Sequence, residues 1–410
     1  MEFLKAVDIK TAREQLLERA KKRGLSVDHV PLDDALGRIL AEDVFTTGDI
    51  PAFRRSTVDG YAVVSPDTAA AGDSIPVFLK LKGRVEMGRT ADFSIVSGEC
   101  AEVPTGAMLP GGADAVIMCE YAEMFGTDGV ALGKGAHYGE NVILPGEDAK
   151  AGDNLLRRGV KLLPQDIGAL AAAGITFVPV FAPIRTVILS TGDELIPPNE
   201  TPAPGQVRDI NTYALAALAR KHGVIVTNAA VLPDDQALIE EAVSSSMDKN
   251  DIVVISGGSS KGTKDLTKDV FDRLASPGVF VHGIALKPGK PTILGCDDKS
   301  CTLLIGLPGH PVSAMIVFEL LIGWLLRELT GSPAPLPIPA KLSCNIASSP
   351  GKLCCWPCRL TQNGGEYTAE PVFGKSGLIT TLTQADGYFT VERNAEGLAT
   401  GSDVMVYLFN

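Results

Sequence analysis

Apolar residues at the start of the chain recur at the spacing of one helix face. Between residues 5 and 24 this face contains Val7, Ala12, Leu16, Leu17 and Ala20. Gly24 follows directly, and glycine commonly ends a helix because it tolerates a left-handed backbone. We therefore predict a helix over 5–24, a strand over 28–32 and a short helix over 33–40.

The pattern changes at residue 51, where short β-rich runs separated by Gly and Asp turns replace the helical spacing. Such runs predict a small β-domain over 51–139. Residues 140–182 return to short strands and an Ala-rich helix over 164–174. We expect this helix to rejoin the N-terminal one, so that 1–50 and 140–182 form one discontinuous, extended N-terminal domain around the insertion.

Strands and helices alternate from residue 183 to residue 331. Apolar runs predict strands over 186–190, 223–231, 251–256, 279–286 and 301–306. Helical spacing predicts helices over about 212–222, 235–247, 264–275 and 311–328. This alternation is typical of a doubly wound α/β domain with a mainly parallel sheet. A proline-rich linker follows, and the remainder of 332–410 is predicted to be a second small, barrel-like β-domain.

Composition narrows the class of protein. A chain of 410 residues is long enough for several domains, and 45% hydrophobic residues exclude a disordered class. A formal net charge of −12 argues against a nucleic-acid surface. The longest apolar run, 314–326, is interrupted by Glu319 and is shorter than the roughly 20 residues of a membrane span. We expect a cytoplasmic protein with no nucleic-acid or membrane partner.

The eight cysteines suit a reducing compartment. Cys355 and Cys358 have the C-x-P-C spacing of a redox motif, next to Cys354, but no βαβ unit surrounds them. A zinc site would need Cys344 and a further ligand, and no nearby histidine completes the set. The alternative is that these cysteines only fill a strand near a turn.

Charged or polar residues, glycines and prolines follow the predicted strands of the α/β domain. They are Asp193 and Glu194, then Asp234, then Gly257, Gly258 and Ser259, then Lys287 and Lys290, and finally Pro308, His310 and Pro311. Open α/β sheets bind ligands where the carboxyl ends of the strands meet. Loops rich in Gly, Pro and Asp are common in this fold, but two lysines beside several acids suggest a crevice for a phosphorylated ligand and a divalent metal.

The segment after the third strand, 255–265, reads ISGGSSKGTKD. Gly257 and Gly262 have the spacing of a P-loop, but Thr263 precedes Lys264 where a P-loop has Lys first. Backbone N–H groups at such a turn and helix start bind anions whatever the order. The segment is therefore either a variant P-loop or an anion site formed by a turn and a helix start, and the residue order favours the anion site.

The chain resembles the molybdopterin molybdenumtransferases, the MoeA and gephyrin E-domain family. The resemblance rests on eight motifs in the order and at the spacing of that family, and it covers nearly the whole chain. They are 56–63 (STVDGYAV), 104–107 (PTGA), 146–148 (GED), 190–195 (STGDEL), 209–211 (DIN), 256–258 (SGG) with Asp265 downstream, 286–291 (LKPGKP) and 306–314 (GLPGHPVSA).

The resemblance implies four domains, an elongated homodimer, and a site between the α/β domain of one subunit and the inserted β-domain of the other. It implies insertion of molybdate, or tungstate, into adenylylated molybdopterin with Mg²⁺-dependent release of AMP. Further implied partners are the upstream adenylyltransferase and recipient molybdoenzymes. A tungstate-preferring paralogue, a scaffold protein on the same fold and an adenylyltransferase acting one step earlier are the alternatives.

Carried over by motif, eleven residues are implied to line the site in addition to the glycine loop. Asp234 and Asp265 would hold Mg²⁺ or orient water, Lys287 and Lys290 would neutralise phosphate, and Thr105 and Ser376 would donate to oxyanions. The others are Asp59, Asp148, Glu194, Pro308 and Pro311. The V-D-G-Y setting of Asp59 is also a good turn, which is its alternative interpretation.

Two departures from the family pattern stand out. Ile143, Leu144 and Pro145 occupy positions where the family often has arginines, which could weaken the oxyanion site. His310 replaces the usual Asn before Pro311. A histidine in a core or capping role is the alternative at that position.

Overall fold

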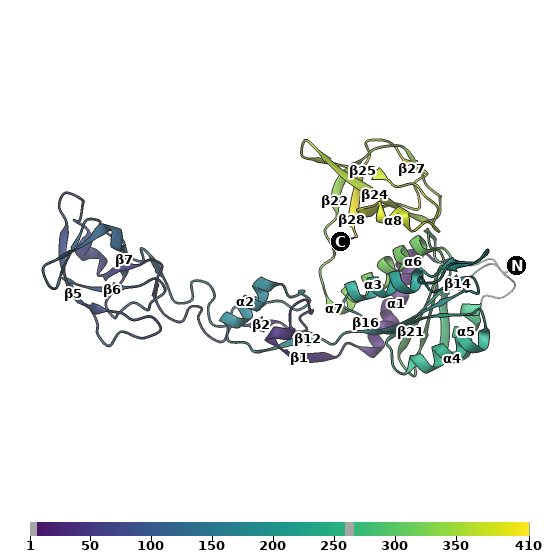
Figure 1. Cartoon of the computed structure of the whole chain (residues 1–410), viewed down its shortest axis with the longest axis horizontal. Helices are drawn as coiled ribbons and strands as arrows, with labels where there is room; N and C mark the ends of the chain where they lie inside the picture. Colours follow the sequence, from purple (N-terminus) through teal and green to yellow (C-terminus); the bar gives the residue numbers. More distant parts are fainter. Residues whose placement is uncertain (1–5, 259–265, 410) are drawn as a thin grey trace.

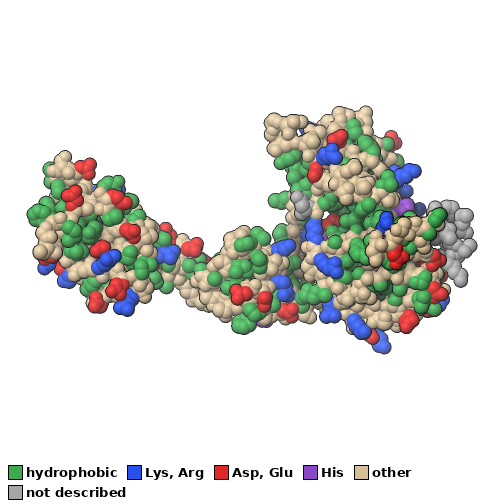
Figure 2. Space-filling view, viewed as in Figure 1, with side chains coloured by type: hydrophobic (Ala, Val, Ile, Leu, Met, Phe, Trp, Pro, Cys, Tyr) green, Lys and Arg blue, Asp and Glu red, His purple; other side chains and the backbone are tan. Residues whose placement is uncertain are grey.

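The computed structural model describes residues 6–258 and 266–409. The chain is elongated, with a β-rich unit at one end, a small unit in the middle and two packed units at the other end (Figure 1). On the face seen in Figure 2, acidic and basic side chains are interspersed over all of them. No helix in these two ranges is long and apolar enough to cross a bilayer.

The first helix, α1 (Ile9–Arg23), begins at Asp8, whose carboxylate accepts a hydrogen bond from the Thr11 N–H at 2.9 Å. It ends at Gly24, with a φ of 71°. Its buried face, formed by Ala12, Leu16 and Ala20, packs into the largest hydrophobic core, that of the α/β unit. The helix therefore lies on the α/β unit. The expectation that it packs with the helix at 164–172 is wrong.

The distal β-unit is a six-stranded sheet in the order β7-β4-β6-β5-β9-β8. Neighbouring residues along a strand face opposite sides: Ala62 packs into one hydrophobic cluster and Val63 into another, so both faces are buried. The strands are β4 (Gly60–Val63), β5 (Val77–Arg84), β6 (Glu99–Val103), β7 (Ala115–Met118), β8 (Ala122–Phe125) and β9 (Gly129–Leu132).

The middle unit consists of paired short strands and one helix, α2 (Pro164–Ala172), around its own small core. The predicted helix over 33–40 is only a 3₁₀ turn (Leu32–Asp34), because Gly37 adopts a left-handed φ of 76° that ends the helical turn. The antiparallel pairs of the middle unit are β1 (Val27–Pro31) with β12 (Phe177–Phe181) and β2 (Val44–Phe45) with β11 (Asn154–Leu156). A third pair, β3 (Arg55–Ser56) with β10 (Val142–Ile143), belongs to the distal β-unit, because Val142 packs into its core.

The α/β unit has a six-stranded sheet in the order β16-β13-β17-β21-β20-β18, with a hydrophobic core on each face. The first four strands are parallel, and β20 is antiparallel to both of its neighbours. The strands are β13 (Arg185–Thr191), β16 (Ile225–Leu232), β17 (Ile252–Ser256), β18 (Pro277–His282), β20 (Ile293–Asp297) and β21 (Thr302–Leu307). The helices are α3 (Asn211–Lys221), α4 (Gln236–Met247), α5 (Leu266–Leu274), α6 (Pro311–Phe318) and α7 (Trp324–Thr330), and a small parallel pair joins β14 (Leu195–Ile196) to β15 (Val207–Arg208).

The C-terminal barrel follows the proline-rich linker. Its strands run in the order β24-β25-β22-β28-β26, and a pairing between β24 and β26 closes the sheet. They are β22 (Ile338–Leu342), β24 (Leu353–Asn363), β25 (Glu366–Pro371), β26 (Gly387–Val391) and β28 (Asp403–Leu408); shorter elements are β23 (Ile346–Ala347), β27 (Gly397–Leu398) and α8 (Thr380–Thr383). The strand β19 (Leu286–Lys287), which belongs to the α/β unit by sequence, pairs in parallel with β24.

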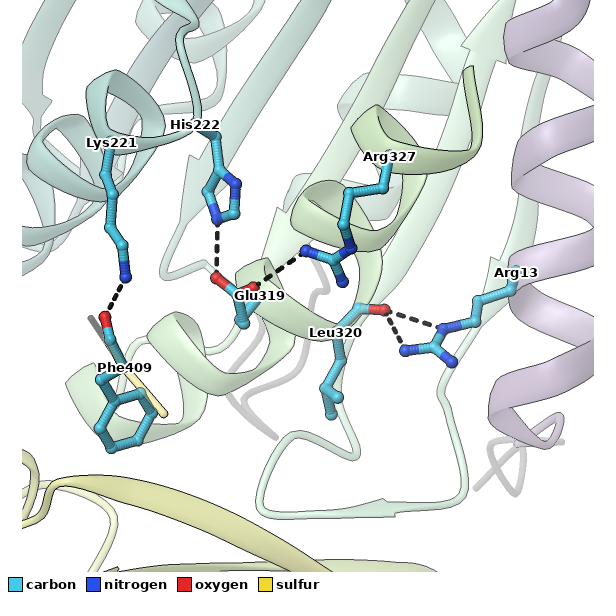
Figure 3. Close-up of polar contacts among 7 residues, drawn as sticks. All are labelled: Arg13, Lys221, His222, Glu319, Leu320, Arg327 and Phe409. Carbon is cyan, nitrogen blue, oxygen red and sulfur yellow. Dashed lines mark hydrogen bonds and ion pairs between the residues drawn. The ribbon is translucent and has the colours of Figure 1, made fainter. Parts of the chain in front are cut away.

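The helix predicted over 311–328 contains a π-helical turn, Glu319–Gly323, between α6 and α7. The turn is held by polar contacts with three other elements (Figure 3). Glu319 lies 2.7 Å from the His222 ring and 3.3 Å from the Arg327 guanidinium. Arg13 of α1 donates two hydrogen bonds to the Leu320 carbonyl, at 2.9 and 2.7 Å. These contacts account for a carboxylate in an apolar helix.

Burial raises the pKa of Glu319, but its hydrogen bond with His222 and the charge of Arg327 outweigh burial and leave the pKa below its ordinary value of 4.5. A carboxyl whose folded pKa is depressed stabilises the fold fully above its unfolded pKa and loses that contribution as the pH falls through the folded pKa. The Glu319 contribution is therefore complete at neutral pH and is lost below about pH 4.5.

We predict that Glu319→Ala lowers the free energy of unfolding by about 1.5–3 kcal/mol at pH 7, the scale of a hydrogen bond to a charged group, because it leaves the half-buried Arg327 and His222 without their partner. Thermal and urea unfolding of the full chain measure this, with Glu328→Ala, an exposed residue of the same helix, as the matched control. The difference between the two variants should shrink as the pH falls below 4.5. Equal stability of the two variants at pH 7 would contradict the assigned role.

Candidate functional site

The carboxyl ends of the parallel strands lie at one edge of the sheet and bring together the acidic residues expected there. Asp193 and Glu194 follow β13, and Asp234 follows the neighbouring strand β16. The backbone N–H of Asp234 donates to Oδ1 of Asp193 at 3.0 Å. The three carboxylates are exposed and form one acidic group at this edge.

Asp234 is electrostatically distinct from its neighbours. Partial burial raises the pKa of its carboxyl, the nearby Thr191 hydroxyl opposes this rise, and the charges of Asp193 and Glu194 raise the pKa further. A divalent cation would relieve this repulsion, and one or two carboxylates beside a phosphate is the usual setting for Mg²⁺. Within 6–258 and 266–409, no three Asp, Glu, His or Cys side chains converge as a ready metal cluster.

Two glycines after β17 have no room for a side chain. Gly257 has a φ of 111°, and a Cβ there would collide with the Thr191 carbonyl; Gly258 has a φ of 65°, and its Cβ would lie 2.8 Å from the Thr267 hydroxyl. Gly257 is therefore packed against the backbone at the end of β13, and Gly258 against the Thr267 side chain of α5. Ser259 and Asp265, and the rest of the segment on which the P-loop question turns, lie outside the described residues.

A buried polar network lies under this edge. Most of its residues belong to the motifs 190–195, 209–211 and 256–258, but none of them was predicted as a site residue. The Asn211 amide donates to the Ser256 hydroxyl and to the Gly309 carbonyl, both at 2.8 Å. The Thr212 hydroxyl donates to that of Ser190 at 2.7 Å. The start of α3 thus ties together the ends of β13, β17 and β21. The signal in the sequence was a run of polar residues directly after apolar strands.

A pocket of about 680 Å³ lies where the C-terminal barrel meets the α/β unit. Two lysines from the α/β unit, Lys287 and Lys290, and two from the barrel side, Lys352 and Lys375, line it together with His310. No Asp or Glu is among its lining residues. We call it the lysine pocket. Sequence analysis identified the first pair, but the second pair lies far along the chain, with no motif to mark it.

Backbone pairing sets the position of these lysines. Lys287 of β19 is paired with Cys354 of β24, and the Leu353 N–H donates to the Ala285 carbonyl at 2.9 Å. The Lys287 ammonium donates to the Ser349 hydroxyl at 2.9 Å. None of the four lysines forms an ion pair with the residues that the structure describes. Four cations without an ion-pair partner in 6–258 and 266–409 around one hollow favour an anion there.

Other predicted residues are divided between the pocket and its surroundings. Pro308 and Ser376 line the pocket, and the Ser376 hydroxyl lies 2.8 Å from Nδ1 of His310. Pro311 does not line it and is buried at the first position of α6. His310 is therefore exposed at the pocket in this structure and does not fill a core.

Asp59, Thr105 and Asp148 lie far from this pocket within one chain. Asp59 and Thr105 flank strands β4 and β6 of the distal β-unit, at the opposite end of the molecule in Figure 1. Oδ1 of Asp59 accepts from the Thr105 N–H at 2.6 Å and from its hydroxyl at 2.9 Å, and the backbone bond holds the pKa of Asp59 below its usual value. Asp148 is exposed between the distal and middle units.

The segment that lacks the expected arginines is also remote from the lysine pocket. Ile143 belongs to β10, and its partner in the pairing is Arg55 of β3. A guanidinium is therefore present opposite this position, supplied by a different strand. Leu144 donates its N–H to the Glu147 carboxylate at 2.7 Å.

The cysteine cluster is buried in β24. Burial raises the pKa of Cys355 and of Cys358 to about 12 in each case, so both thiols are protonated at neutral pH. All eight cysteines are free, and none belongs to a metal-binding group among the described residues. Thiolate chemistry at the C-x-P-C spacing has no support in this environment.

Comparison with known proteins gives a consistent result. Residues 7–174 match the model of the MoeA N-terminal region (domain I and II), 187–328 that of a probable molybdopterin binding domain, and 339–409 that of the MoeA C-terminal region (domain IV). These three models together span most of the chain.

Relatives and solved structures match over nearly the full length. A putative molybdopterin biosynthesis protein of Methanocaldococcus jannaschii is 32% identical, covering 98% of this chain and 97% of that protein. A molybdopterin molybdenumtransferase of Haemophilus influenzae is 30% identical, over 97% of this chain and 98% of that one. The crystal structure of a molybdopterin biosynthesis MoeA protein from Pyrococcus horikoshii has a TM-score of 0.84 and 31% identity, covering 99% and 100% of the two chains.

We predict that Asp193→Asn lowers the pKa of Asp234 towards its ordinary value, because a neighbouring negative charge is removed while the amide keeps a similar size. Carboxyl ¹³C NMR titration of Asp234 measures the shift. Glu241→Gln, on the exposed side of the adjacent helix α4, is the control and should leave the titration unchanged. An unchanged Asp234 titration in the Asp193 variant would show that the two carboxylates are not coupled.

Proposed function

Since the chain belongs to the MoeA family and is an enzyme of its molybdopterin molybdenumtransferase class, we propose that it inserts molybdate into adenylylated molybdopterin and releases AMP. It acts in molybdenum cofactor biosynthesis. Molybdate and the adenylylated pterin are the substrates in this proposal, Mg²⁺ is the cofactor, and the cytoplasm is the compartment.

The observation that carries the proposal is the lysine pocket. The chain has a formal net charge of −12. Among the described residues, four lysines without ion-pair partners line one hollow, and no described Asp or Glu lines it. Such a local field attracts polyanions against the overall charge. Both proposed substrates are oxyanions, one a pyrophosphate and the other a metal oxyanion.

Each group has a proposed task. Lys287 and Lys290 neutralise phosphate oxygens as point charges. Ser376 and His310 are hydrogen-bonded to each other, so the neutral pair offers an oxyanion one free donor at this wall, the Ser376 hydroxyl or the His310 Nε2–H according to the ring tautomer. Pro308 and Pro311 fix the backbone where β21 enters α6. Gly257, Gly258 and Ser259 are proposed from the sequence as the anion-binding loop; of these, Gly257 already donates its N–H to the Leu307 carbonyl at 3.3 Å, so the loop would bind the ligand through the residues that follow it.

The acidic edge suits the proposed metal. The raised pKa of Asp234 marks a carboxyl that gains from a nearby cation, with Glu194 beside it, and Asp265 is proposed from the sequence as the second ligand. When bound, Mg²⁺ would neutralise and orient the phosphoanhydride. Asp234 and Asp265 are also the proposed groups that hold the attacking water.

We further propose that the site is completed by a second copy of the chain. Asp59 and Thr105 are exposed at the end of the molecule opposite the lysine pocket. They could reach the pocket of their own chain only if the elongated molecule bent, whereas they could face the pocket of a second copy without any bending. An isologous dimer would give two equal sites, each with Asp59, Thr105 and Asp148 from one copy and the lysine pocket from the other.

The assay for the proposed reaction is AMP release from adenylylated molybdopterin with Mg²⁺ and molybdate. We expect release by the wild type and a weaker apparent affinity for the adenylylated pterin in Lys352→Ala, by about 10- to 100-fold, the scale of one charge-assisted hydrogen bond. Lys341→Ala, an exposed lysine of the barrel outside the pocket, is the control. Absence of AMP release in the wild type with either molybdate or tungstate contradicts the proposed function, and preference for tungstate selects the alternative substrate.

Mixing two inactive variants tests the shared site. We predict that Asp59→Asn and Lys287→Ala each lose most activity, and that co-refolding them restores about a quarter of the wild-type rate, because half of the mixed dimers are heterodimers with one intact site. Asp59→Asn co-refolded with itself is the control. If the mixture stays as inactive as its components although light scattering shows dimers, the residues do not meet across an interface.

A further inference from the structure

The lysine pocket has an aromatic residue in its wall as well as cations. Trp356 of β24 lines the pocket, and Val372 and Gly374 line it on either side of Phe373. The rings of Trp356 and Phe373 meet edge to face, with centroids 5.7 Å apart and planes at 77°. Phe373 itself is 64% exposed. A half-buried indole is thus held in a fixed orientation at the edge of a cationic hollow.

The position of Trp356 follows from the same pairing that positions the lysines. Cys354 is paired with Lys287 and lies two residues before Trp356 on β24. The side chains of Cys354 and Trp356 therefore project from the same side of that strand. Trp356 packs in part against the barrel core and leaves the rest of its surface to the pocket. The indole therefore has one supported side and one side available to a ligand.

The size of the pocket exceeds what a tetrahedral anion needs. At about 680 Å³ it falls within the range of sites that enclose a drug-sized organic ligand, roughly 300–1,000 Å³. A phosphate or molybdate held by the lysines would fill only part of it. The remaining space adjoins an aromatic surface, and the combination of cations and an aromatic platform is the one that binds phosphorylated heteroaromatic compounds.

We propose that Trp356, oriented by Phe373, is the surface on which the planar heteroaromatic ring of the substrate stacks while the lysines hold its phosphates. The ring is either the pterin or the adenine of the adenylylated pterin, and their shared chemistry is a flat, polarisable π-system. The identity of the ligand rests on the proposed function, whereas the stacking itself is a property of the pocket and needs no turnover.

Calorimetric titration distinguishes the contribution of the ligand's aromatic ring to affinity from that of its phosphate. The probes are AMP, pterin-6-carboxylate and inorganic phosphate, each titrated into the wild type, Trp356→Phe and Trp356→Ala. We expect Trp356→Ala to weaken one ring-bearing probe by about 5- to 150-fold, the scale of one stacked base. Trp356→Phe should largely preserve that affinity, and phosphate should bind equally to all three proteins. The probe that loses affinity identifies the ring.

The second tryptophan of the chain provides a spectroscopic control. Trp324 lies under the Arg13 guanidinium, 5.0 Å from its ring centroid, and does not line the pocket. In Trp324→Phe, which keeps only Trp356, binding of AMP should change the emission if adenine is the stacked ring. In Trp356→Phe, which keeps only Trp324, it should not. This pair remains informative if Trp356→Ala fails to fold.

The proposal is overturned if neither ring probe loses affinity in Trp356→Ala, or if phosphate loses as much as they do, because the residue would then only support the fold. Stacking of adenine on Trp356 is excluded if AMP binding changes Trp324 emission but not that of Trp356, and the proposal then stands or falls on the pterin probe. Failure of the proposed reaction is a separate outcome, since it appears as no AMP release in a wild type whose ring probes still bind.

Discussion

The parallel pairing of β19 with β24 is the constraint on which the lysine pocket depends. It joins a two-residue strand of the α/β unit to the barrel, and hydrogen bonds from residue 7 on its other side hold the same segment: the Ala285 N–H donates to the Val7 carbonyl at 2.7 Å. The lysine loop is therefore clamped between two distant parts of the chain. Backbone hydrogen bonds of this kind have a fixed geometry, so the main chain sets the separation of Lys287 from Lys352, which directly precedes β24.

Contacts around the π-helical turn also fix the barrel and α1 to the α/β unit. Arg13 bonds to the Leu320 carbonyl, and the Lys221 ammonium reaches the carbonyl of Phe409 near the end of the barrel (Figure 3). Tyr388 of the barrel packs into the same core as α1 and α6. An N-terminal helix, a helix of the α/β unit and a strand of the barrel thus share one hydrophobic core. A pocket between two units keeps its shape only when the units are fixed to each other in this way.

Local patterns in the sequence predicted the elements, and the strand-end rule predicted which residues gather at one edge. Asp193, Asp234 and Lys287 were found because each directly follows an apolar run. Lys352 and Lys375 could not be found, since their place in the pocket depends on a barrel docking against the sheet. The strand β20 is as long as β17, and it was missed because Gly295 interrupts its apolar run. The π turn was missed because one extra residue does not disturb apolar periodicity. The position of α1 was misjudged, since an amphipathic face does not say which core it will enter.

The narrow middle of the molecule has a mechanical consequence. The chain crosses between the middle and α/β units only twice, at 24–26 and 182–184, and the two crossings are linked by a hydrogen bond from the Ala182 N–H to the Ser26 carbonyl. The distal β-unit therefore acts as a lever arm, so a small rotation at this waist becomes a large displacement of Asp59. The stiffness of the waist, more than any contact near Asp59, limits how accurately that carboxylate can be presented to a site outside its own unit.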